Sequence, residues 1–222
     1  SPDQVLEILR EGNRRFQTGN RLTRDLGREV DATASGQAPL AAILSCIDSR
    51  VPAELVFDLG IGDVFSIRVA GNVIGSKSLG SIEYGVGVAG VKLVLVLGHT
   101  RCGAVTSYVK LLGENADIEE ATGCQHLHKI VNEIAPCIDS FEFGRFQTLG
   151  DDDKDSFVDE VARRNVRRSV KEIVKRSAVI REAVEEGRVL VVGALYDVKS
   201  GGIEILDEQE STSASPMLNE SS

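Results

Sequence analysis

The stretch VKLVLVLG, residues 91–98, decides the fold class. Valine and leucine fill it almost without interruption, which is typical of a strand buried on both faces of a parallel sheet. Two helical patterns accompany it: SLGSIEYGVGVAG (78–90) and a long charged segment from about Ser156 to Glu186. Three further runs have the same apolar, β-rich character: LAAILS (40–45), VFSIRVA (64–70) and VLVVGAL (189–195). Apolar strands that alternate with helices predict a parallel sheet with helices on both faces.

Further elements are predicted before the first and after the last of these strands. Residues 3–18 place apolar side chains at the spacing of an amphipathic helix and predict an N-terminal helical arm. The polar residues 20–37 show little periodicity. The run IEIL (203–206) follows Ser200-Gly201-Gly202 and is expected to turn back as an edge strand. The predicted fold class is therefore α/β: a central, mostly parallel β-sheet of about four strands plus an antiparallel edge strand, flanked by helices.

Length and composition indicate one domain. The chain has 222 residues, and its 42% of hydrophobic residues can bury a substantial core. We expect this domain to span residues 1–207, followed by a disordered, acidic and serine-rich tail at 208–222. The sequence begins Ser1-Pro2 without a methionine, so we expect a processed product or a piece of a longer protein.

Charge and cysteine content exclude several classes of protein. The net charge of -9 has no basic block to offset it, which argues against nucleic-acid binding. No apolar run approaches the roughly 18 residues that span a bilayer, and no signal peptide precedes the first helix, so we expect no membrane insertion. Four widely spaced cysteines do not resemble a secreted disulfide framework, which favours a reducing, cytoplasmic location.

Cysteine and histidine follow two of the predicted strands at the point where each strand ends. Cys46 lies in ILSCIDSR (43–50), and His99 and Cys102 lie in GHTRCG (98–103). Loops at the carboxyl ends of parallel strands face a common crevice, so these side chains converge if the two strands are neighbours. Two thiolates and one imidazole fit one Zn²⁺ per chain with a tetrahedral position left open, as in catalytic zinc sites.

Two charged residues complete this candidate site. Residues two apart point the same way in an extended segment, so Cys46, Asp48 and Arg50 are expected to share a side. Asp48 would then accept a hydrogen bond from a zinc-bound water. Arg50 would hold Asp48 in a bidentate pair and keep its carboxylate out of the open position.

Each of these residues alone has a simpler interpretation. Cys46 alone suits a small buried hydrophobe, His99 a polar strand end, and Asp48 with Arg50 a turn ion pair. Their joint position at two strand ends favours the metal site. A serine hydrolase is excluded because no G-x-S-x-G occurs. The run GVGVAG (85–90) has the glycine content of a dinucleotide-binding fingerprint but precedes a strand instead of following one, so that interpretation is discounted. The remaining candidate ligands are expected in a helical segment, on its surface or in the core: Cys124, His126, His128 and Cys137.

The motifs C-x-D-S-R (46–50) and G-H-x-x-C-G (98–103) resemble those of β-class carbonic anhydrases, and the resemblance extends through GDVFSIRVAGNV (62–73), SIEYGV (81–86) and GALYDVKSG (193–201). It implies zinc held by Cys46, His99 and Cys102, with Asp48 and Arg50 serving the bound water. It further implies a homodimer or dimer of dimers. The implied reaction is reversible hydration of CO2 to bicarbonate and a proton by zinc-bound hydroxide. The implied substrate pocket is small and apolar, lined by Val69, Ala70, Gly71 and the backbone around Gly103.

Two details refine this resemblance. Bicarbonate-inhibited members of the family carry a tryptophan where this chain has Ile43; Arg68 and Tyr84 match its two partners, so the regulatory anion site is expected to be absent or weakened. Residues 23–50 also resemble carbonic anhydrase-like domains fused to bacterial sulfate-permease-type transporters, which implies a tether to a membrane anion transporter. Two alternatives remain open: a non-catalytic, zinc-stabilised regulatory domain, and a hydrolase of a CO2 isostere such as carbonyl sulfide.

Overall fold

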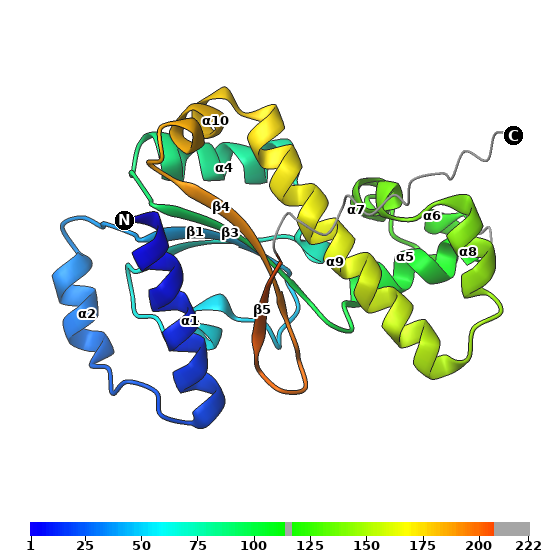
Figure 1. Ribbon diagram of the computed structural model, residues 1–222, viewed down its shortest axis with the longest axis horizontal. Coiled ribbons are helices and arrows are strands. Elements are labelled where there is room, and N and C mark those ends of the chain that lie inside the picture. The colour runs from blue at the N-terminus through cyan, green and yellow to red at the C-terminus, as the bar shows by residue number, and fades with distance from the viewer. Residues whose placement is uncertain (114–116, 207–222) are drawn as a thin grey trace, which may run out of the picture.

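A five-stranded sheet forms the centre of the protein, in the order β2-β1-β3-β4-β5 (Figure 1). The computed structural model describes residues 1–113 and 117–206. Four strands are parallel, and β5 runs antiparallel to β4 at the edge, which confirms the predicted fold class. The strands are β1 (Ala41–Ser45), β2 (Val64–Arg68), β3 (Leu93–His99), β4 (Leu190–Tyr196) and β5 (Ile203–Leu206).

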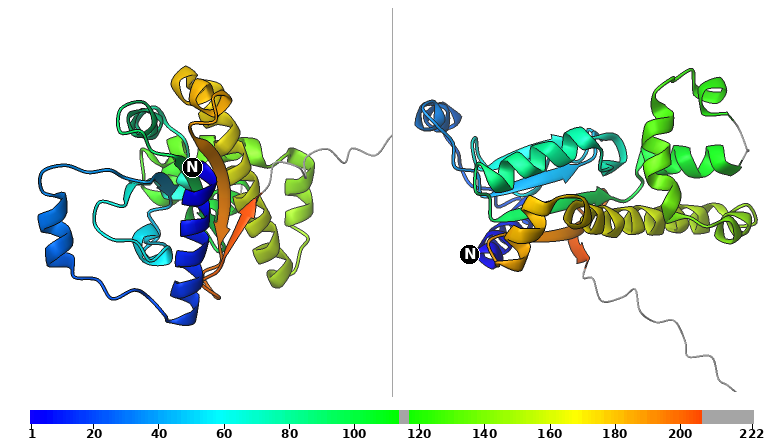
Figure 2. Two further views of the ribbon diagram at one scale, coloured as in Figure 1. Left: turned by 60° about the vertical axis from the view of Figure 1, so that its left-hand side comes forward. Right: turned by 90° about the horizontal axis from the view of Figure 1, so that it is seen from above.

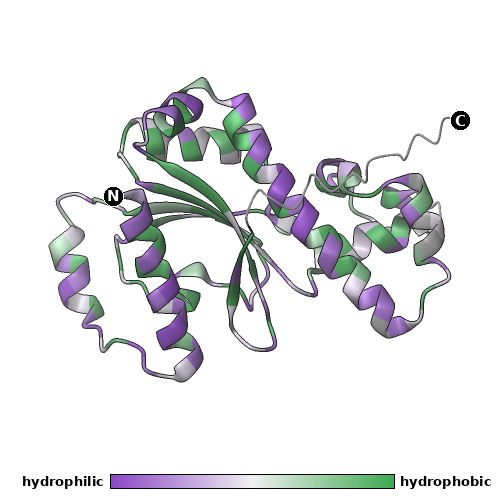
Figure 3. Ribbon diagram, in the orientation of Figure 1, coloured by the Kyte–Doolittle hydropathy of each residue, from purple (hydrophilic) through white to green (hydrophobic). Residues whose placement is uncertain are grey.

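Successive side chains of β3 point to opposite faces of the sheet, and both faces are buried, which explains its continuous apolar run. Val94 and Val96 pack into the core beneath α4 (Ser76–Gly87), α9 (Asp151–Arg176) and α10 (Ala178–Glu185). Leu93, Leu95 and Leu97 pack into the opposite core beneath α1 (Pro2–Thr18) and α3 (Ala53–Val56). Both faces of β3 are therefore buried, and most of the central sheet has the colour of hydrophobic residues in Figure 3.

The N-terminal arm contains one helix more than the sequence predicts. The helix predicted from the amphipathic pattern of residues 3–18 is α1. It begins with a capping box between Ser1 and Gln4. Helix α2 (Leu26–Thr33) begins where the side chain of Asp25 accepts a hydrogen bond from the Arg28 amide. It buries no residue, so its sequence lacks the apolar stripe on which pattern reading depends.

The long charged segment predicted from about Ser156 to Glu186 is two helices. Helix α9 ends at Arg176, and Ser177 caps α10 by accepting a hydrogen bond from the Ile180 amide. Helix α9 crosses β3 and β4 closely because both strands have a glycine beneath it. A Cβ on Gly98 would lie 2.4 Å from Val166 Cγ2, and one on Gly193 would lie 2.6 Å from Val166 Cγ1.

Short helices gather around the N-terminal half of α9, at one end of the sheet (Figures 1 and 2). They are α5 (Gly103–Gly113), α6 (Ile118–Thr122), α7 (Leu127–Ile134) and α8 (Ser140–Phe146), and two 3₁₀ turns are η1 (Ala70–Asn72) and η2 (Ala135–Cys137). No helix in the described part of the chain has the length and apolar character needed to cross a bilayer. The boundary predicted at residue 207 and the tail 208–222 lie outside the described residues.

Candidate metal centre

The order of the strands opens a crevice between the carboxyl ends of β1 and β3. From β1 the chain passes to β2 on one side, and then returns to place β3 on the other side. Loops that leave adjacent strands in opposite directions leave such a crevice at the carboxyl ends of those strands. Cys46 directly follows β1, His99 ends β3, and Cys102 precedes α5, so all three residues lie at this point.

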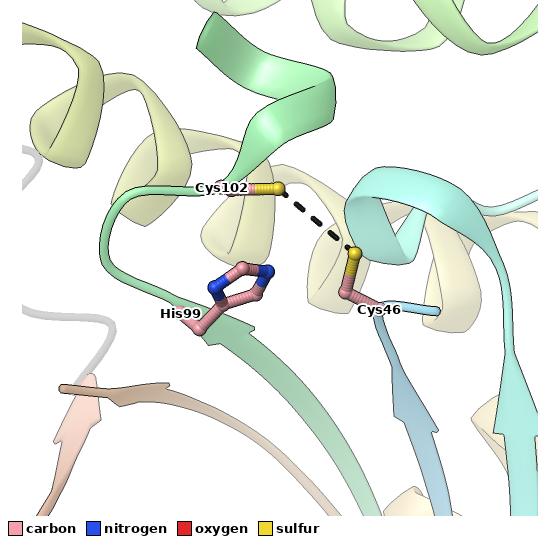
Figure 4. A group of neighbouring side chains, drawn as sticks. All are labelled: Cys46, His99 and Cys102. Carbon is pink, nitrogen blue, oxygen red and sulfur yellow. Dashed lines mark hydrogen bonds between the residues drawn. The ribbon is translucent and has the colours of Figure 1, made fainter. Parts of the chain in front are cut away.

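The three side chains converge there, as the sequence predicts (Figure 4). Their donor atoms all lie within 4.8 Å of one another, and the two Sγ atoms are 4.0 Å apart. All three residues are buried, with exposed fractions of 3% for Cys46, 0% for His99 and 1% for Cys102. Within the described residues, this is the single group of three or more such side chains close enough to share a metal ion.

The chemistry of this donor set fits a zinc ion. Nδ1 of His99 lies 2.9 Å from the carbonyl oxygen of Thr100, which accepts a hydrogen bond in the tautomer that carries the proton on Nδ1. Nε2 is then a free acceptor; it is buried and has no hydrogen-bond partner in the described part of the protein. A histidine ligand held through its second nitrogen by a carbonyl is the usual arrangement around zinc.

Proton sharing between the two thiols supports the same fit. The hydrogen bond between Cys102 and Cys46 lowers the pKa of Cys46 to about 4 and, together with burial, raises the pKa of Cys102. Without a cation, the pair therefore holds one proton between two sulfurs. A divalent cation replaces that proton and stabilises both thiolates, which is the form that binds zinc.

Asp48 and Arg50 form the predicted bidentate pair. Arg50 donates from Nε to Asp48 Oδ1 at 2.9 Å and from Nη2 to Oδ2 at 2.7 Å. The side-chain hydrogen bonds from Arg50 lower the pKa of Asp48 to about 2, against the opposing effect of burial. Asp48 Oδ2 also lies 3.9 Å from His99 Nε2, so the carboxylate is directed at the candidate centre.

The prediction that residues 46–50 form an extended segment is wrong. The chain turns at Ser49 and Arg50, where the backbone amide of Arg50 donates to Asp48 Oδ1 at 2.9 Å. The Val51 amide donates to the Asp48 carbonyl at 3.1 Å. An Asx turn therefore brings the two side chains together, because the carboxylate binds the backbone two residues on.

Contacts from distant segments were not predicted. Arg68 donates to the carbonyl oxygens of Cys46 at 3.0 Å and Asp48 at 2.6 Å, and so ties the loop after β1 to the end of β2. Arg101 has a φ of 54°, and its amide donates to Asp159 Oδ1 at 2.7 Å. These contacts join positions far apart in the chain, so no local pattern reports them.

The residues expected to line the substrate pocket lie beside the centre. Val69 and Ala70 are half-buried, Gly71 is buried, and Gly103 is exposed at the start of α5. Gly71 approaches the start of α5 closely, since a Cβ built on it would lie 3.4 Å from Ala104 Cβ. Their contact with substrate stays a prediction.

The other candidates lie elsewhere in the fold. Cys124, His126 and His128 are exposed near the start of α7, whereas Cys137 is buried. At the family's regulatory anion position, Ile43 is fully buried in β1. Arg68 is engaged with the loop after β1, and the exposed Tyr84 ring lies 6.0 Å from that of Phe65. The absence of the regulatory site stays a prediction.

The fold and the centre define an α/β protein in which two cysteines and one histidine at a strand switch point could hold a metal ion. The carbonic anhydrase family model matches residues 41–203. Carbonic anhydrase 2 of Mycobacterium tuberculosis is 37% identical over 204 residues, which are 90% of this chain and 91% of that protein. This chain belongs to the β-class carbonic anhydrase family.

Solved structures agree with this assignment. The β-carbonic anhydrase CafA of Aspergillus fumigatus matches with a TM-score of 0.69 at 30% identity, over 82% of this chain and 81% of that chain. A chain from the tetrameric β-carbonic anhydrases of Sordaria macrospora matches with a TM-score of 0.67 at 24% identity, over 81% of this chain and 90% of that chain. At 24% identity, the second match shows similarity of fold alone.

Proposed function

We propose that this protein is a zinc-dependent carbonic anhydrase that hydrates CO2 reversibly to bicarbonate and a proton. The observation that carries the proposal is the convergence of three buried donors at the strand switch point, with the Asp48–Arg50 pair beside them. Cys46, His99 and Cys102 would hold one zinc ion per chain. Zinc, when bound, lowers the pKa of a water ligand so that a hydroxide nucleophile forms near neutral pH.

The protein's own groups orient the reactants. The carbonyl of Thr100 holds the His99 ring in the tautomer that presents Nε2 to the centre. Asp48 stays ionised at working pH because Arg50 keeps its pKa at about 2, so its carboxylate accepts a hydrogen bond from the reacting water. Arg50 also holds that carboxylate out of the open position beside the three donors, where the reacting water and then CO2 must meet. We assign the wall of that position to Val69, Ala70, Gly71 and Gly103.

Stopped-flow CO2 hydration, combined with a zinc assay, tests this function. The chain should bind one zinc ion and catalyse hydration, and Cys102→Ser should lose both properties because a hydroxyl is a poor zinc ligand at neutral pH. Hydration at the uncatalysed rate by folded, zinc-loaded protein would refute the proposal. The non-catalytic domain and the carbonyl sulfide hydrolase are not favoured by relatives that are named carbonic anhydrases. None of the relatives reported above is named as a transporter, so the tether has no support among them.

We also propose that the chain assembles as a homodimer or a dimer of dimers. Large apolar side chains are exposed on α2 and within residues 47–88, where a partner would cover them: Leu26, Val30, Ile47, Leu55, Tyr84 and Val88. Four unpaired cysteines support a cytoplasmic location. Light scattering after gel filtration measures the assembly, and a monomer at micromolar concentration would contradict the dimer.

A further inference from the structure

Helix α9 passes behind the metal centre and contributes one buried polar side chain to it. Asn165 is 1% exposed, and its Nδ2 donates to the carbonyl oxygen of Gly71 at 2.7 Å. The backbone amide of Gly71 in turn donates to Cys46 Sγ at 3.3 Å. A chain of two hydrogen bonds therefore joins α9 to a sulfur of the metal centre.

Gly71 needs this support because its conformation is unusual and it has no side chain. Its φ is 65°, in the left-handed region, and the next residue, Asn72, also has a positive φ of 44°. A Cβ on Gly71 would lie 3.1 Å from Ile134 Cδ1 and 3.4 Å from Ala104 Cβ, so a larger residue does not fit. Two hydrogen bonds hold Gly71 from outside η1: its carbonyl accepts from Asn165, and its amide donates to Cys46.

Packing alone does not account for an asparagine at this position. The neighbouring positions of α9 that face the core are the apolar Val161, Ala162 and Val166. Oδ1 of Asn165 is buried without a hydrogen-bond partner in the described part of the protein. A leucine would avoid the unsatisfied Oδ1 but would leave the buried Gly71 carbonyl without its donor, so the asparagine at this position serves the bond to Gly71.

We propose that Asn165 is a positioning residue for the metal centre, acting through Gly71 on Cys46. By fixing the Gly71 carbonyl, it directs the Gly71 N–H at the Cys46 sulfur. An N–H donor withdraws electron density from a thiolate, and such outer hydrogen bonds tune both the affinity and the Lewis acidity of a bound metal. This inference rests on the metal site of the proposed function.

The test compares two substitutions at Asn165 with one control on the same helix. Asn165→Leu removes the donor to Gly71 together with all polar character, and Asn165→Asp nearly preserves the shape and lacks the donor when its carboxyl group is ionised. Ser169→Ala is the matched control, since Ser169 is equally buried on α9 and its Oγ has no hydrogen-bond partner among the described residues. Zinc affinity is measured by chelator competition, and thiolate donation by the sulfur-to-cobalt charge-transfer band of Co²⁺-loaded protein.

We expect both Asn165 variants to bind zinc about tenfold more weakly, near the lower end of the effect of outer-shell substitutions. Their charge-transfer band should move to longer wavelength, because the sulfur electrons are no longer held by the N–H donor. Ser169→Ala should change neither quantity. A purely structural role of Asn165 would lower the melting temperature without moving the band of the folded fraction.

Two results overturn the inference. One is an unchanged band and affinity in folded Asn165→Leu; the other is rapid hydrogen exchange of the Gly71 amide in the unsubstituted, Zn²⁺-loaded protein, which can be measured even if neither variant folds. Failure of the unsubstituted protein to bind Co²⁺ or Zn²⁺ would instead refute the proposed function, so the two failures are distinguishable.

Discussion

Replacing Arg50 with alanine releases the carboxylate that lies nearest the candidate zinc ligands. Arg50 is half-exposed, whereas the side chain of Asp48 is only 15% exposed and has its Oδ2 3.9 Å from His99 Nε2. Without the guanidinium, Asp48 can rotate toward a bound metal ion and take the position meant for water. We expect Arg50→Ala to retain zinc and to lose most of its activity.

The contacts set the size of the effect. The variant loses two charge-assisted hydrogen bonds to Asp48 and a longer one, at 3.2 Å, to the carbonyl oxygen of Arg101; such bonds contribute ~1.5–3 kcal/mol each when well shielded. Solvent at Arg50 weakens them, and the backbone amide of residue 50 still holds Oδ1 at 2.9 Å. A net loss of about 1.5–2 kcal/mol corresponds to a fall of roughly 10- to 30-fold in CO2 hydration. The CO2 hydration rate of Arg50→Lys should lie between those of the unsubstituted protein and Arg50→Ala, since an ammonium group cannot form the bidentate pair.

Stopped-flow hydration gives the rate, and X-ray absorption at the zinc edge counts the sulfur, nitrogen and oxygen ligands. The control is Arg10→Ala, an exposed arginine of α1 whose side chain makes no ion pair with the described residues. The reasoning is refuted if Arg50→Ala keeps the unsubstituted rate, or if its crystal structure shows water still in the fourth zinc position.

Three further changes test other parts of the structure. Burial favours the neutral form of Asp58, but hydrogen bonds from Arg15 and the Leu22 amide outweigh it and hold its pKa below the ordinary value. The stabilisation by this carboxylate is therefore present above about pH 4 and lost as the pH falls through the lowered pKa. Asp58→Asn should destabilise the protein by about 2 kcal/mol at pH 7, because Arg15 loses its partner, and the deficit in urea unfolding should shrink in acid. Gly98→Ala should cost about 1–3 kcal/mol by forcing α9 away, and Val166→Ala should restore part of the loss; an unaffected single variant would contradict the close packing. Deleting residues 208–222 should leave calorimetric unfolding and CO2 hydration unchanged, and a clear loss of either would move the domain boundary predicted at residue 207.

The sheet and the convergence of Cys46, His99 and Cys102 could be predicted because local patterns carry them. A strand buried on both faces, such as β3, must be apolar at every position, and loops after parallel strands must meet at one edge. Helix α2 could not be predicted because it buries nothing within the chain.

Polar contacts between residues far apart in the chain could not be predicted from the sequence either. Asn165 is 94 positions from Gly71 in the sequence, and Arg68 is 22 positions from Cys46. The pairing of Asp48 with Arg50 was predicted correctly from a wrong local geometry, because a turn and an extended segment can bring the same two side chains together.

The order of the site's parts along the chain has a consequence for biosynthesis. All three donors lie in the first half of the sequence, with 56 positions between the two cysteines, so a nascent chain exposes a complete ligand set early. Helix α9, which braces Gly71 from behind, emerges from the ribosome only later. If an ion binds during translation, its ligands at that stage lack the support of α9, so we expect the ion to dissociate more slowly after α9 has packed behind Gly71.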